Sequence, residues 1–361
     1  MKLAYVNFYS GLADRGGETY VDSLAQRLSQ KHEVYLFQVG SKKVAKKYQT
    51  EEINVSFNSN HSHSKLPVTH ILKRLFLDYF HLKELEFTIK LLPKLWKIKP
   101  DIIFPQNSGW EVILLRIFSC IINAKIIVAG QSGPGWNDRV NLYIYPDVFV
   151  ALTKSQALWA KKATPWKNQK IAVIPNGVDL EKFTAKGKKR VVGLSHPIVL
   201  VVGAAIKSKR VSTTINAVAH LKNTSLLVVG TGPQEVSEDN LGHKILGNRY
   251  LRLKVSHSDM PSIYRSSDVF TLCSDSSEAF GIVYLEALAT GLPCVVTDDP
   301  SRREILGNVG LFVKNPENSQ EYAEKIKEAI NQKSSEKFTK QASKYSWDII
   351  ASKYEKILDE K

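Results

Sequence analysis

The stretch S-D-S-S-E-A-F-G-I-V-Y-L-E-A-L-A-T-G, residues 274–291, decides the fold of this chain. It follows an apolar run, residues 268–273, which is short and bounded like a buried strand. From Phe280 its apolar residues have helical spacing up to Gly291, and a second apolar run follows at 293–296. This order predicts a β-α-β unit with parallel strands and a right-handed crossover.

The loop between the strand and the helix is the usual ligand site in such a sheet. A helix that begins near Phe280 leaves the backbone amides of residues 281–283 without partners inside it, and such amides suit a phosphate. Glycine at 281 lets a ligand approach the backbone closely. Glu278 precedes the helix and Glu286 lies about two turns inside it, so one carboxylate could meet a sugar and the other a ribose.

The same stretch resembles the E-x7-E signature of the retaining glycosyltransferases of family GT4, which have the GT-B fold. The wording E-A-F-G-I-V-Y-L-E-A-L-A-T-G-L-P-C-V-V-T is more specific than the two glutamates alone. The strings I-P-N-G-V-D at 174–179 and G-T-G-P at 230–233 also resemble the family. The resemblance covers nearly the whole chain and is strongest from about 171 to 315.

Strand and helix patterns alternate from the first residues and begin again at 197–203, which predicts an α/β protein with two halves. The resemblance implies two Rossmann-like domains that face each other across a cleft, with a C-terminal helix crossing back to the first. The expected parts are an acceptor-side domain at 1–180, a linker at 181–196, a donor-side domain at 197–345 and the returning helix at 346–361.

The resemblance also implies roles for individual residues. Glu286 would bind the ribose hydroxyls, Glu278 would face the donor sugar, and Lys209 would act with Glu278 in catalysis. The first domain would contribute a pair of glycines that close on the diphosphate. The full set of expected donor-binding residues is Gly16, Gly17, Lys207, Lys209, Arg210, Glu278, Ala279, Phe280, Gly281, Ile282, Val283 and Glu286.

One departure from the family concerns the diphosphate. The family usually has an arginine directly after the glycine at the end of its V-G-R strand, and here Gly203 is followed by Ala204. Lys209 keeps the family's lysine position, and Lys207 or Arg210 could supply the missing charge. Cations there would stabilise the leaving diphosphate in the transition state. The alternative is a solvated helix start, but a helix N-terminus does not favour cations unless an anion is near.

A second departure is Gln131, in a loop where many relatives have a histidine that touches the donor sugar or the acceptor. Glutamine can hydrogen-bond a sugar hydroxyl but cannot act as a base at neutral pH. The family's chemistry needs no protein base, because the leaving phosphate takes the acceptor proton. The chain has no D-x-D, which agrees with a metal-independent site, and residues 298–299 are expected in a loop.

Composition sets the broad class. The 361 residues suffice for two domains, and the net charge is +15, with the larger basic excess in the first half. No run approaches the length of a membrane span, the N-terminus has no cleavage-site pattern, and the three cysteines lie in apolar runs, so we expect a cytoplasmic protein. The basic excess favours either simple solubility or peripheral contact with an anionic membrane on its inner face. Nucleic acid is the least favoured partner, because the basic residues form no stripe with aromatic ones.

Two stretches of the first half leave alternatives open. Residues 41–65 are polar and are expected as a surface loop, and the nearby histidines 61, 63 and 70 have no acidic or cysteine partners for a metal. Residues 68–98 predict one or two amphipathic helices with basic residues between the apolar ones. Such a face either packs on the sheet or lies near the acceptor or the membrane.

The sequence therefore predicts a metal-independent, retaining hexosyltransferase. Its co-substrate would be a UDP- or GDP-linked sugar, with no further cofactor, and its acceptor the hydroxyl of a glycan or lipid-linked glycan. A nucleotide-sugar 2-epimerase of the same fold is the nearest enzymatic alternative and would need no acceptor. A catalytically silent sugar-nucleotide-binding subunit is the other, because the family arginine is missing.

Overall fold

The computed structural model describes residues 1–12, 16–40, 47–57, 72, 74–166, 168–332 and 336–360. It divides into two compact units. The first contains residues 1–175 together with 350–361, and the second contains residues 176–349. We describe each unit by itself.

The sheet of the first unit has seven strands, all of them parallel, in the order β3-β2-β1-β4-β5-β6-β7. Its strands are β1 (Lys2–Val6), β2 (Glu33–Gln38), β3 (Gln49–Glu52), β4 (Ile102–Pro105), β5 (Lys125–Ala129), β6 (Val148–Ala151) and β7 (Ile171–Val173). Strand β3 lies in the stretch 41–65, where we expected only a loop, so that expectation is wrong for these four residues. They pair with β2 although their side chains are polar, because β3 is an edge strand and faces water. The three histidines of that prediction lie outside the described residues.

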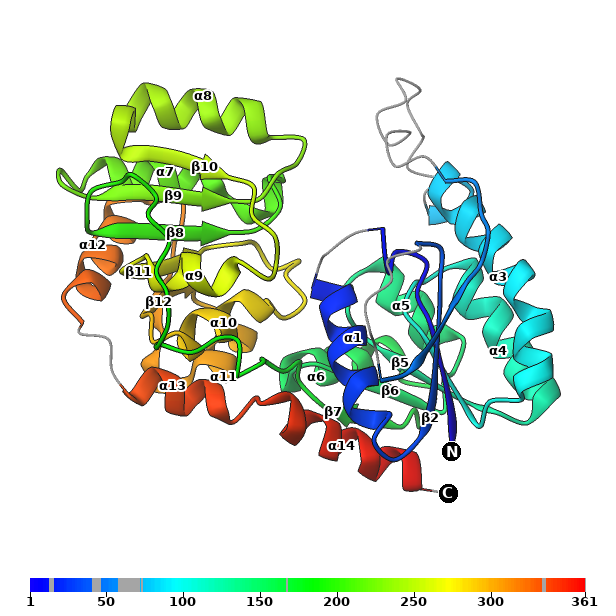
Figure 1. The fold of residues 1–361 in the computed structure, drawn as a ribbon. Helices are drawn as coiled ribbons and strands as arrows, with labels where there is room; N and C mark the ends of the chain where they lie inside the picture. The colour runs from blue at the N-terminus through cyan, green and yellow to red at the C-terminus, as the bar shows by residue number, and fades with distance from the viewer. Residues whose placement is uncertain are drawn as a thin grey trace. The chain divides into compact units, whose positions relative to one another are not determined.

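Helices cover both faces of this sheet (Figure 1). The helices of the first unit are α1 (Gly16–Leu28), α3 (Tyr79–Ile98), α4 (Trp110–Ile122), α5 (Trp136–Tyr143), α6 (Lys154–Ala163) and α14 (Trp347–Asp359), the last of which enters the unit at Ile350. Alternate residues of β1 point to opposite faces. Ala4 and Val6 join the apolar cluster of α3 to α6, whereas Tyr5 stacks on Phe104 on the other side.

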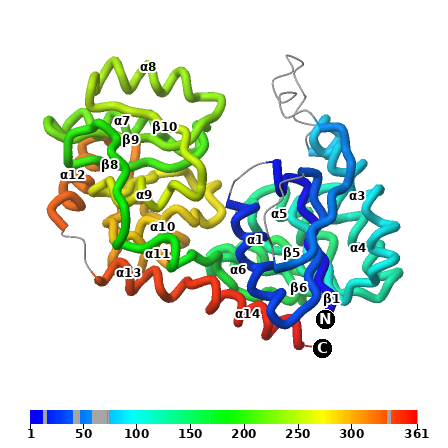
Figure 2. The backbone as a smooth tube through the Cα atoms, in the orientation of Figure 1, coloured from blue at the N-terminus to red at the C-terminus, as the bar shows by residue number. Residues whose placement is uncertain are grey.

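The returning helix packs on the face of Tyr5 and Phe104. The ring of Tyr354 lies 6.4 Å from that of Phe104, and its hydroxyl is 2.8 Å from the hydroxyl of Tyr20 on α1. Both chain ends lie at the amino edge of this sheet, where the Lys125 amine donates to the carbonyl of Glu360 (Figure 2). The predicted C-terminal helix that crosses back to the first half is therefore present.

Helix α3 begins later than the amphipathic pattern suggested. Within 68–98 the structure describes residues 72 and 74–98, and the long helix begins at Tyr79. Asp78 caps it by accepting from the backbone N–H groups of Phe80 and His81 at 3.0 and 3.4 Å. Its buried side chains, which include Phe87 and Leu91, show that one face of the helix packs on the sheet.

The second unit has a parallel sheet of six strands in the order β10-β9-β8-β11-β12-β13. Its strands are β8 (Ile198–Val202), β9 (Ser225–Val229), β10 (Tyr250–Leu253), β11 (Val269–Leu272), β12 (Cys294–Thr297) and β13 (Leu311–Val313). Its helices of six residues or more are α7 (Val211–Ala219), α8 (Glu235–Leu246), α9 (Met260–Arg265), α10 (Ile282–Ala289), α11 (Pro300–Leu306), α12 (Ser319–Ile330) and α13 (Glu336–Ser343).

Strand β11 shows how these helices divide between the two faces. Thr271 points to one face, where its hydroxyl lies 2.7 Å from that of Tyr322 on α12. Its neighbour Phe270 points to the other, where it meets the rings of Tyr264 on α9 and Tyr284 on α10. The strand order reverses between β8 and β11, so a crevice outside their carboxyl ends is the expected ligand position.

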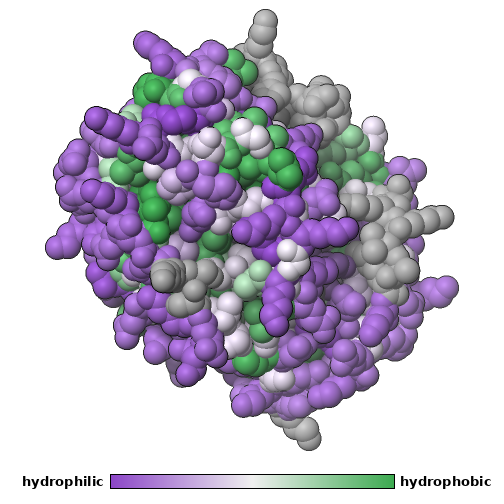
Figure 3. Space-filling model, turned by 60° about the vertical axis from the view of Figure 1, so that its left-hand side comes forward, coloured by the Kyte–Doolittle hydropathy of each residue, from purple (hydrophilic) through white to green (hydrophobic). Residues whose placement is uncertain are grey.

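The predicted fold class is confirmed by these two parallel sheets with helices on both faces. The stretch 274–291 forms the loop and helix of the predicted β11–α10–β12 unit. Its helix begins at Ile282, two residues later than we expected from Phe280. In the face shown in Figure 3, hydrophilic residues predominate and hydrophobic ones lie in patches between them.

Candidate functional site

The loop between β11 and α10 carries most of the predicted donor residues. Gly281 precedes α10 in the left-handed region, with φ 81°, and a Cβ there would lie 2.3 Å from the ring of Tyr284. Only glycine adopts this conformation readily and leaves room for the ring. The late helix start follows, because a residue with positive φ cannot belong to the helix.

The backbone N–H groups of residues 281–283 are available to a ligand. Among the hydrogen bonds of the described residues, none is donated by these three amides, whereas the amide of Tyr284 donates to the carbonyl of Gly281 at 3.0 Å. Free amides at a helix start suit an anion such as phosphate. The two-residue shift of the helix therefore leaves the predicted amide site in place.

Lys209 and Glu278, predicted from separate parts of the sequence, meet in the structure. The Lys209 amine donates to Oε2 of Glu278. Lys209 ends the short turn Lys207–Lys209 after β8, and the amide of Asp275 donates to the carbonyl of Ser208 in that turn at 2.8 Å. The two loops that flank the reversal of strand order are thus joined by a backbone hydrogen bond and an ion pair.

This ion pair is largely withdrawn from water. The Lys209 side chain is 19% exposed and that of Glu278 is 13% exposed. An ion pair of low exposure depends strongly on its partner, because either charge left alone would be poorly solvated. The cation predicted to bind phosphate is therefore paired with the carboxylate predicted to face the sugar.

Lys207 and Arg210 do not share in this pair. Lys207 is exposed. Arg210 follows the turn with φ 51°, and its Nε lies 3.4 Å from Oε1 of Glu317. Arg210 directly precedes α7, which begins at Val211, and the turn Lys207–Lys209 stands before it, where we expected a helix start. Lys209 is the member of this group that the structure places against Glu278.

Glu286 is buried on α10 and both of its carboxylate oxygens have partners. Oε2 accepts from the Tyr264 hydroxyl at 2.8 Å, and Oε1 lies 3.2 Å from Nε2 of His257. Burial and the neighbouring carboxylate raise the pKa of Tyr264 well above its usual value, so the phenol stays a donor. Each carboxylate oxygen keeps lone pairs that can accept a further hydrogen bond.

Three side chains at this site were not predicted from the sequence: Tyr264, His257 and Arg302. Tyr264 lies on α9 in an apolar pattern that signals only a buried face. His257 lies in the loop after β10, with its ring 5.7 Å from that of Phe183. Arg302 is buried on α11 beside Ser274. None of them had a spacing that could have pointed to Glu286 or to the loop after β11.

Residues 298–299, which we expected in a loop, make specific contacts with their side chains. Asp299 is the N-cap of α11 and accepts from the backbone amide of Arg302 at 2.9 Å. Asp298 pairs with Arg303, and this hydrogen bond with the nearby cation lowers the pKa of Asp298. Both carboxylates are thus occupied by arginines.

The predicted residues of the first unit lie at the carboxyl edge of its own sheet. Gly16 and Gly17 begin α1, which follows β1 after a segment that includes the undescribed residues 13–15. Gln131 follows β5 and is half-buried. The structure places these three residues in one unit and the other predicted residues in the second.

Asp138 fixes the loop that carries Gln131. Its carboxylate is fully buried, and it accepts from the Gln156 side chain at 3.1 Å and from the backbone amides of Ser132 and Gly133. Burial raises the pKa of Asp138 to about 7, against the effect of these hydrogen bonds. The loop is therefore fixed on its inner side by the Asp138 carboxylate, which is not exposed to solvent.

Within the described residues, no three histidine, cysteine or acidic side chains gather in a group that could hold a metal ion. Among the same residues, no helix is long and apolar enough to cross a membrane.

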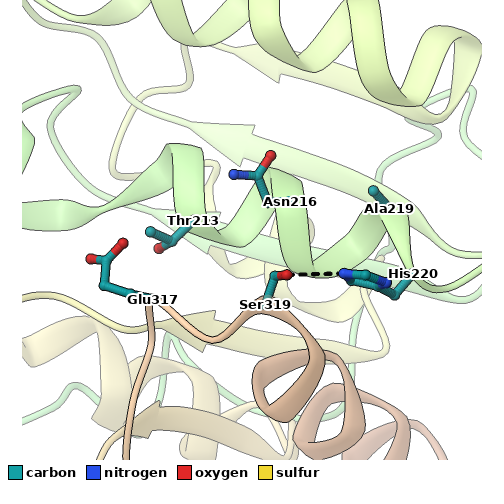
Figure 4. A pocket seen from close by; sticks show the side chains of 6 residues that line it. All are labelled: Thr213, Asn216, Ala219, His220, Glu317 and Ser319. Carbon is teal, nitrogen blue, oxygen red and sulfur yellow. Dashed lines mark hydrogen bonds between the residues drawn. The ribbon is translucent and has the colours of Figure 1, made fainter.

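A pocket of about 340 Å³ lies between α7 and the start of α12, and Glu317 of its lining is the residue that contacts Arg210. In Figure 4 the His220 ring points to the hydroxyl of Ser319, 2.9 Å from it. None of its lining residues belongs to the predicted site. They are Thr213, Asn216, Ala219, His220, Glu317 and Ser319.

Comparison with known protein families gives two matches that together span most of the chain. Residues 15–182 match the model described as Glycosyltransferase Family 4. Residues 184–345 match the model described as Glycosyl transferases group 1. The second match contains the loop after β11 and both glutamates.

Curated relatives match over different lengths. Spore coat protein SA of Bacillus subtilis is 23% identical over 92% of this chain and 89% of its own. The UDP-Gal:alpha-D-GlcNAc-diphosphoundecaprenol alpha-1,3-galactosyltransferase of Escherichia coli is 34% identical over 60% of this chain and 62% of its own. The phosphatidyl-myo-inositol mannosyltransferase of Mycobacterium tuberculosis is 29% identical over 39% of each chain. The chain thus spans less than two thirds of the length of the last two.

Solved structures share the fold over the full length. The Anabaena protein Alr3699/HepE in complex with UDP and glucose superposes with a TM-score of 0.77 at 18% identity, over 100% of both chains. WaaG, a glycosyltransferase involved in lipopolysaccharide biosynthesis, superposes with a TM-score of 0.72 at 15% identity, over 99% of this chain and 100% of its own. At these identities the likeness establishes the fold alone.

Proposed function

Because the chain belongs to the GT4 family of glycosyltransferases and has the GT-B fold of that family, we propose that it transfers a hexose from a nucleotide-diphosphate sugar to a hydroxyl of a glycan or lipid-linked glycan. The transfer would retain the configuration of the anomeric carbon. The observation that carries the proposal is the meeting of Lys209 and Glu278 beside the open amides of residues 281–283.

Each group at this position has a task in such a transfer. The amides and the Lys209 amine would hold the diphosphate, and Glu286 would hold the ribose. The bond between the anomeric carbon and the phosphate oxygen breaks, and the bond to the acceptor oxygen forms on the same face. The acceptor proton passes to the leaving phosphate oxygen, so no side chain needs to act as a base.

Donor binding would have to rearrange the Lys209–Glu278 pair. The diphosphate offers Lys209 a stronger anionic partner, and Glu278 would then be free to accept from a sugar hydroxyl. In the ion pair, neither charge is left without a partner. Transition-state stabilisation by a preorganised cation is the largest effect expected of these residues.

We infer that the transfer needs no metal ion, because a cation and helix amides take the place that a divalent ion occupies in other transferases. Activity should persist in excess EDTA with undiminished rate. An activity that is abolished by chelation and restored by magnesium or manganese would refute this part of the proposal.

The base and the sugar of the donor are proposed only as a class, UDP- or GDP-linked. The name of the E. coli relative includes UDP-Gal, and the Anabaena structure contains UDP. The test is a panel of UDP- and GDP-sugars in a thermal-melting assay, since a bound donor raises the melting temperature. Stabilising donors are then incubated with lipid-linked and free glycans.

The assay also separates the two alternative functions. A 2-epimerase would release a free epimeric sugar without an acceptor, and a silent subunit would bind the donor but release nothing. Glycosidic product in the presence of an acceptor, with no epimer in its absence, is the expected result.

We propose in addition that the protein contacts an anionic membrane through an apolar edge of its first unit. This edge consists of Leu75, Leu77, Leu82 and Trp136, which are 42–54% exposed, with the cation Arg74 among them. The indole N–H of Trp136 donates to the carbonyl of Arg74 at 2.9 Å. That of Trp110 donates to Phe76 at 3.0 Å, so the loop is held at the carboxyl edge of the sheet.

An apolar loop that is fixed in place and has a cation within it suits the surface of an anionic bilayer. The protein should sediment with phosphatidylglycerol vesicles, and the double variant Leu75→Asp/Leu77→Asp should not. Ile121→Asp is the matched control, because Ile121 is equally apolar and 63% exposed but lies at the far end of α4. Equal sedimentation of all three proteins would refute this edge as the contact.

A further inference from the structure

Arg302 is a buried arginine that the proposed mechanism does not use. It lies on α11, after β12, and is 3% exposed. A buried guanidinium is costly unless it is paired and fully hydrogen-bonded. Its ion pair with Asp299 meets the first requirement. The groups that accept hydrogen bonds from its guanidinium show what the residue does.

Arg302 gives most of its hydrogen bonds to the loop after β11. Its Nη2 lies 2.6 Å from the hydroxyl of Ser274, 3.1 Å from the carbonyl of Ser274 and 2.9 Å from the carbonyl of Asp275. These carbonyls belong to a segment that has left the strand, so they lack the partners that a sheet supplies. Arg302 thus fastens the first two residues of the loop, and the Thr297 hydroxyl adds a hydrogen bond to the carbonyl of Ser274 at 2.8 Å.

The fastened segment leads directly to Lys209 and Glu278. The amide of Asp275 donates to Ser208, the residue before Lys209, at 2.8 Å. The amide of Glu278 in turn lies 3.4 Å from the carbonyl of Asp275. The position of Asp275 therefore affects both members of the ion pair, since its backbone is hydrogen-bonded to Ser208 and to Glu278.

Arg302 also reaches the start of α10 through Tyr284. Its Nε donates to the Tyr284 hydroxyl at 3.1 Å, and that hydroxyl is also 3.2 Å from the hydroxyl of Ser274. The Tyr284 ring fills the space in which a Cβ of Gly281 would stand. The same guanidinium thus braces the ring under the open amides of residues 281–283.

We propose that Arg302 is a positioning residue for the donor, one that sets the loop 274–281 so that Lys209, Glu278 and the helix amides converge on the diphosphate. This inference rests on the proposed function. Arg302 touches no reacting atom, because it is covered by the loop that it holds. Its contribution is geometric, and displacements of about 1 Å at a reacting centre can cost about 10²-fold in rate.

Arg302→Lys is the decisive variant. Lysine keeps the charge for Asp299 but has one amine in place of a planar fork, so it cannot serve Ser274, Asp275 and Tyr284 together. Arg303→Lys is the matched control. Arg303 is the next residue, its side chain is 56% exposed, and it pairs with Asp298 and lies over the ring of Phe312.

Two measurements are made on both variants. Hydrogen exchange, followed by mass spectrometry, should become faster in the segment 274–284 of Arg302→Lys and stay unchanged in Arg303→Lys. In transfer assays, kcat/KM for the donor should fall about 10²-fold for Arg302→Lys, with kcat carrying most of the loss. Tyr284→Phe, which removes one acceptor and keeps the ring, should give a smaller loss of the same kind.

A folded Arg302→Lys with parental exchange in 274–284, or with parental kcat/KM, overturns the inference. A lower melting temperature with parental kcat per folded molecule does so too, because it shows a role in stability alone. If the unaltered protein transfers no sugar, the proposed function fails, and the exchange measurement still decides whether Arg302 holds the loop.

Discussion

The two units present the same edge of the same kind of sheet, yet they use buried carboxylates in different ways. In the second unit, Glu278 pairs with a lysine and Glu286 accepts from a tyrosine and a histidine. In the first unit, Glu111 accepts from the backbone amides of Gln106 and Asn107 at 3.1 and 3.0 Å. The two glutamates of the second unit contact other side chains, whereas Glu111 holds two backbone amides and also accepts from the side-chain amide of Asn107 at 2.7 Å.

The difference lies in how readily such a carboxylate can change its partner. A carboxylate that holds a loop from below cannot exchange its partners without unfolding that loop, as Asp138 also illustrates. An ion pair between two side chains can open when an anion arrives. The proposed donor site lies in the second unit, whereas Glu111 and Asp138 of the first unit hold its loops in place.

The largest effect should come from Lys209→Ala. It removes the cation at the diphosphate and leaves Glu278 unpaired beside an anion, so turnover should fall by about 10²–10³. Lys207→Ala, at an exposed cation of the same turn, is the control and should lose far less. Steady-state transfer kinetics on both variants measure this.

Glu278→Gln combined with Lys209→Ala sharpens the result. The double variant should recover part of the loss, because the unpaired carboxylate is gone, and the cycle measures the coupling of the two residues. Transfer by Lys209→Ala at the parental rate would mean that the diphosphate is held elsewhere.

The next effect concerns pH and the first unit. Burial raises the pKa of Glu111 from 4.5 to about 7, and that of Asp138 from 3.8 to about 7. The folded state then binds these protons more tightly than the unfolded state does. The stability they contribute is full at low pH. It declines as pH rises from about 4.5 to about 7 for Glu111, by about 3 kcal/mol, and from about 4 to about 7 for Asp138, by about 4 kcal/mol.

Urea unfolding between pH 5 and pH 8 tests this decline. Five of the six tryptophans lie in the first unit, so tryptophan fluorescence reports mainly on it. Glu111→Gln keeps the shape and removes one titration, so its stability should fall less steeply with pH. Identical pH slopes for the variant and the parent would show that Glu111 does not titrate in this range.

Glu286→Ala should weaken donor binding by about tenfold or more, because hydrogen bonds to a charged group are worth about 1.5–3 kcal/mol. Glu286→Gln keeps one acceptor oxygen and should lose less. Calorimetric titration of the donor into both folded variants gives the affinities. Parental affinity in Glu286→Ala would remove this residue from the site and leave Tyr264 and His257 as its structural partners only.

The smallest effect is expected from Ala204→Arg, which restores the family residue. Ala204 is exposed in the second unit, so an arginine has room, and activity should stay unchanged or rise. If the substitution abolishes transfer in a well-folded protein, the pocket has been reshaped around alanine and the donor phosphates lie elsewhere. The melting temperature of the variant serves as the folding control.

The sequence by itself determined most of the strands and the positions of Glu278 and Glu286 around one helix start, but it predicted neither α8 nor β10. Those features depend on neighbours within a few residues, because strand and helix periodicity and the glycine before α10 are local signals. The edge strand β3 was missed for the same reason, since its four polar residues carry no apolar alternation.

Only the tertiary structure decided which groups meet. Lys209 and Glu278 are 69 residues apart, His257 lies 29 residues from Glu286, and Arg302 lies 28 residues from Ser274. These contacts arise because β8 and β11 become neighbours where the strand order reverses, and α11 folds back under the loop after β11. The sequence around a single arginine or histidine does not indicate which distant residue it will contact in the folded protein.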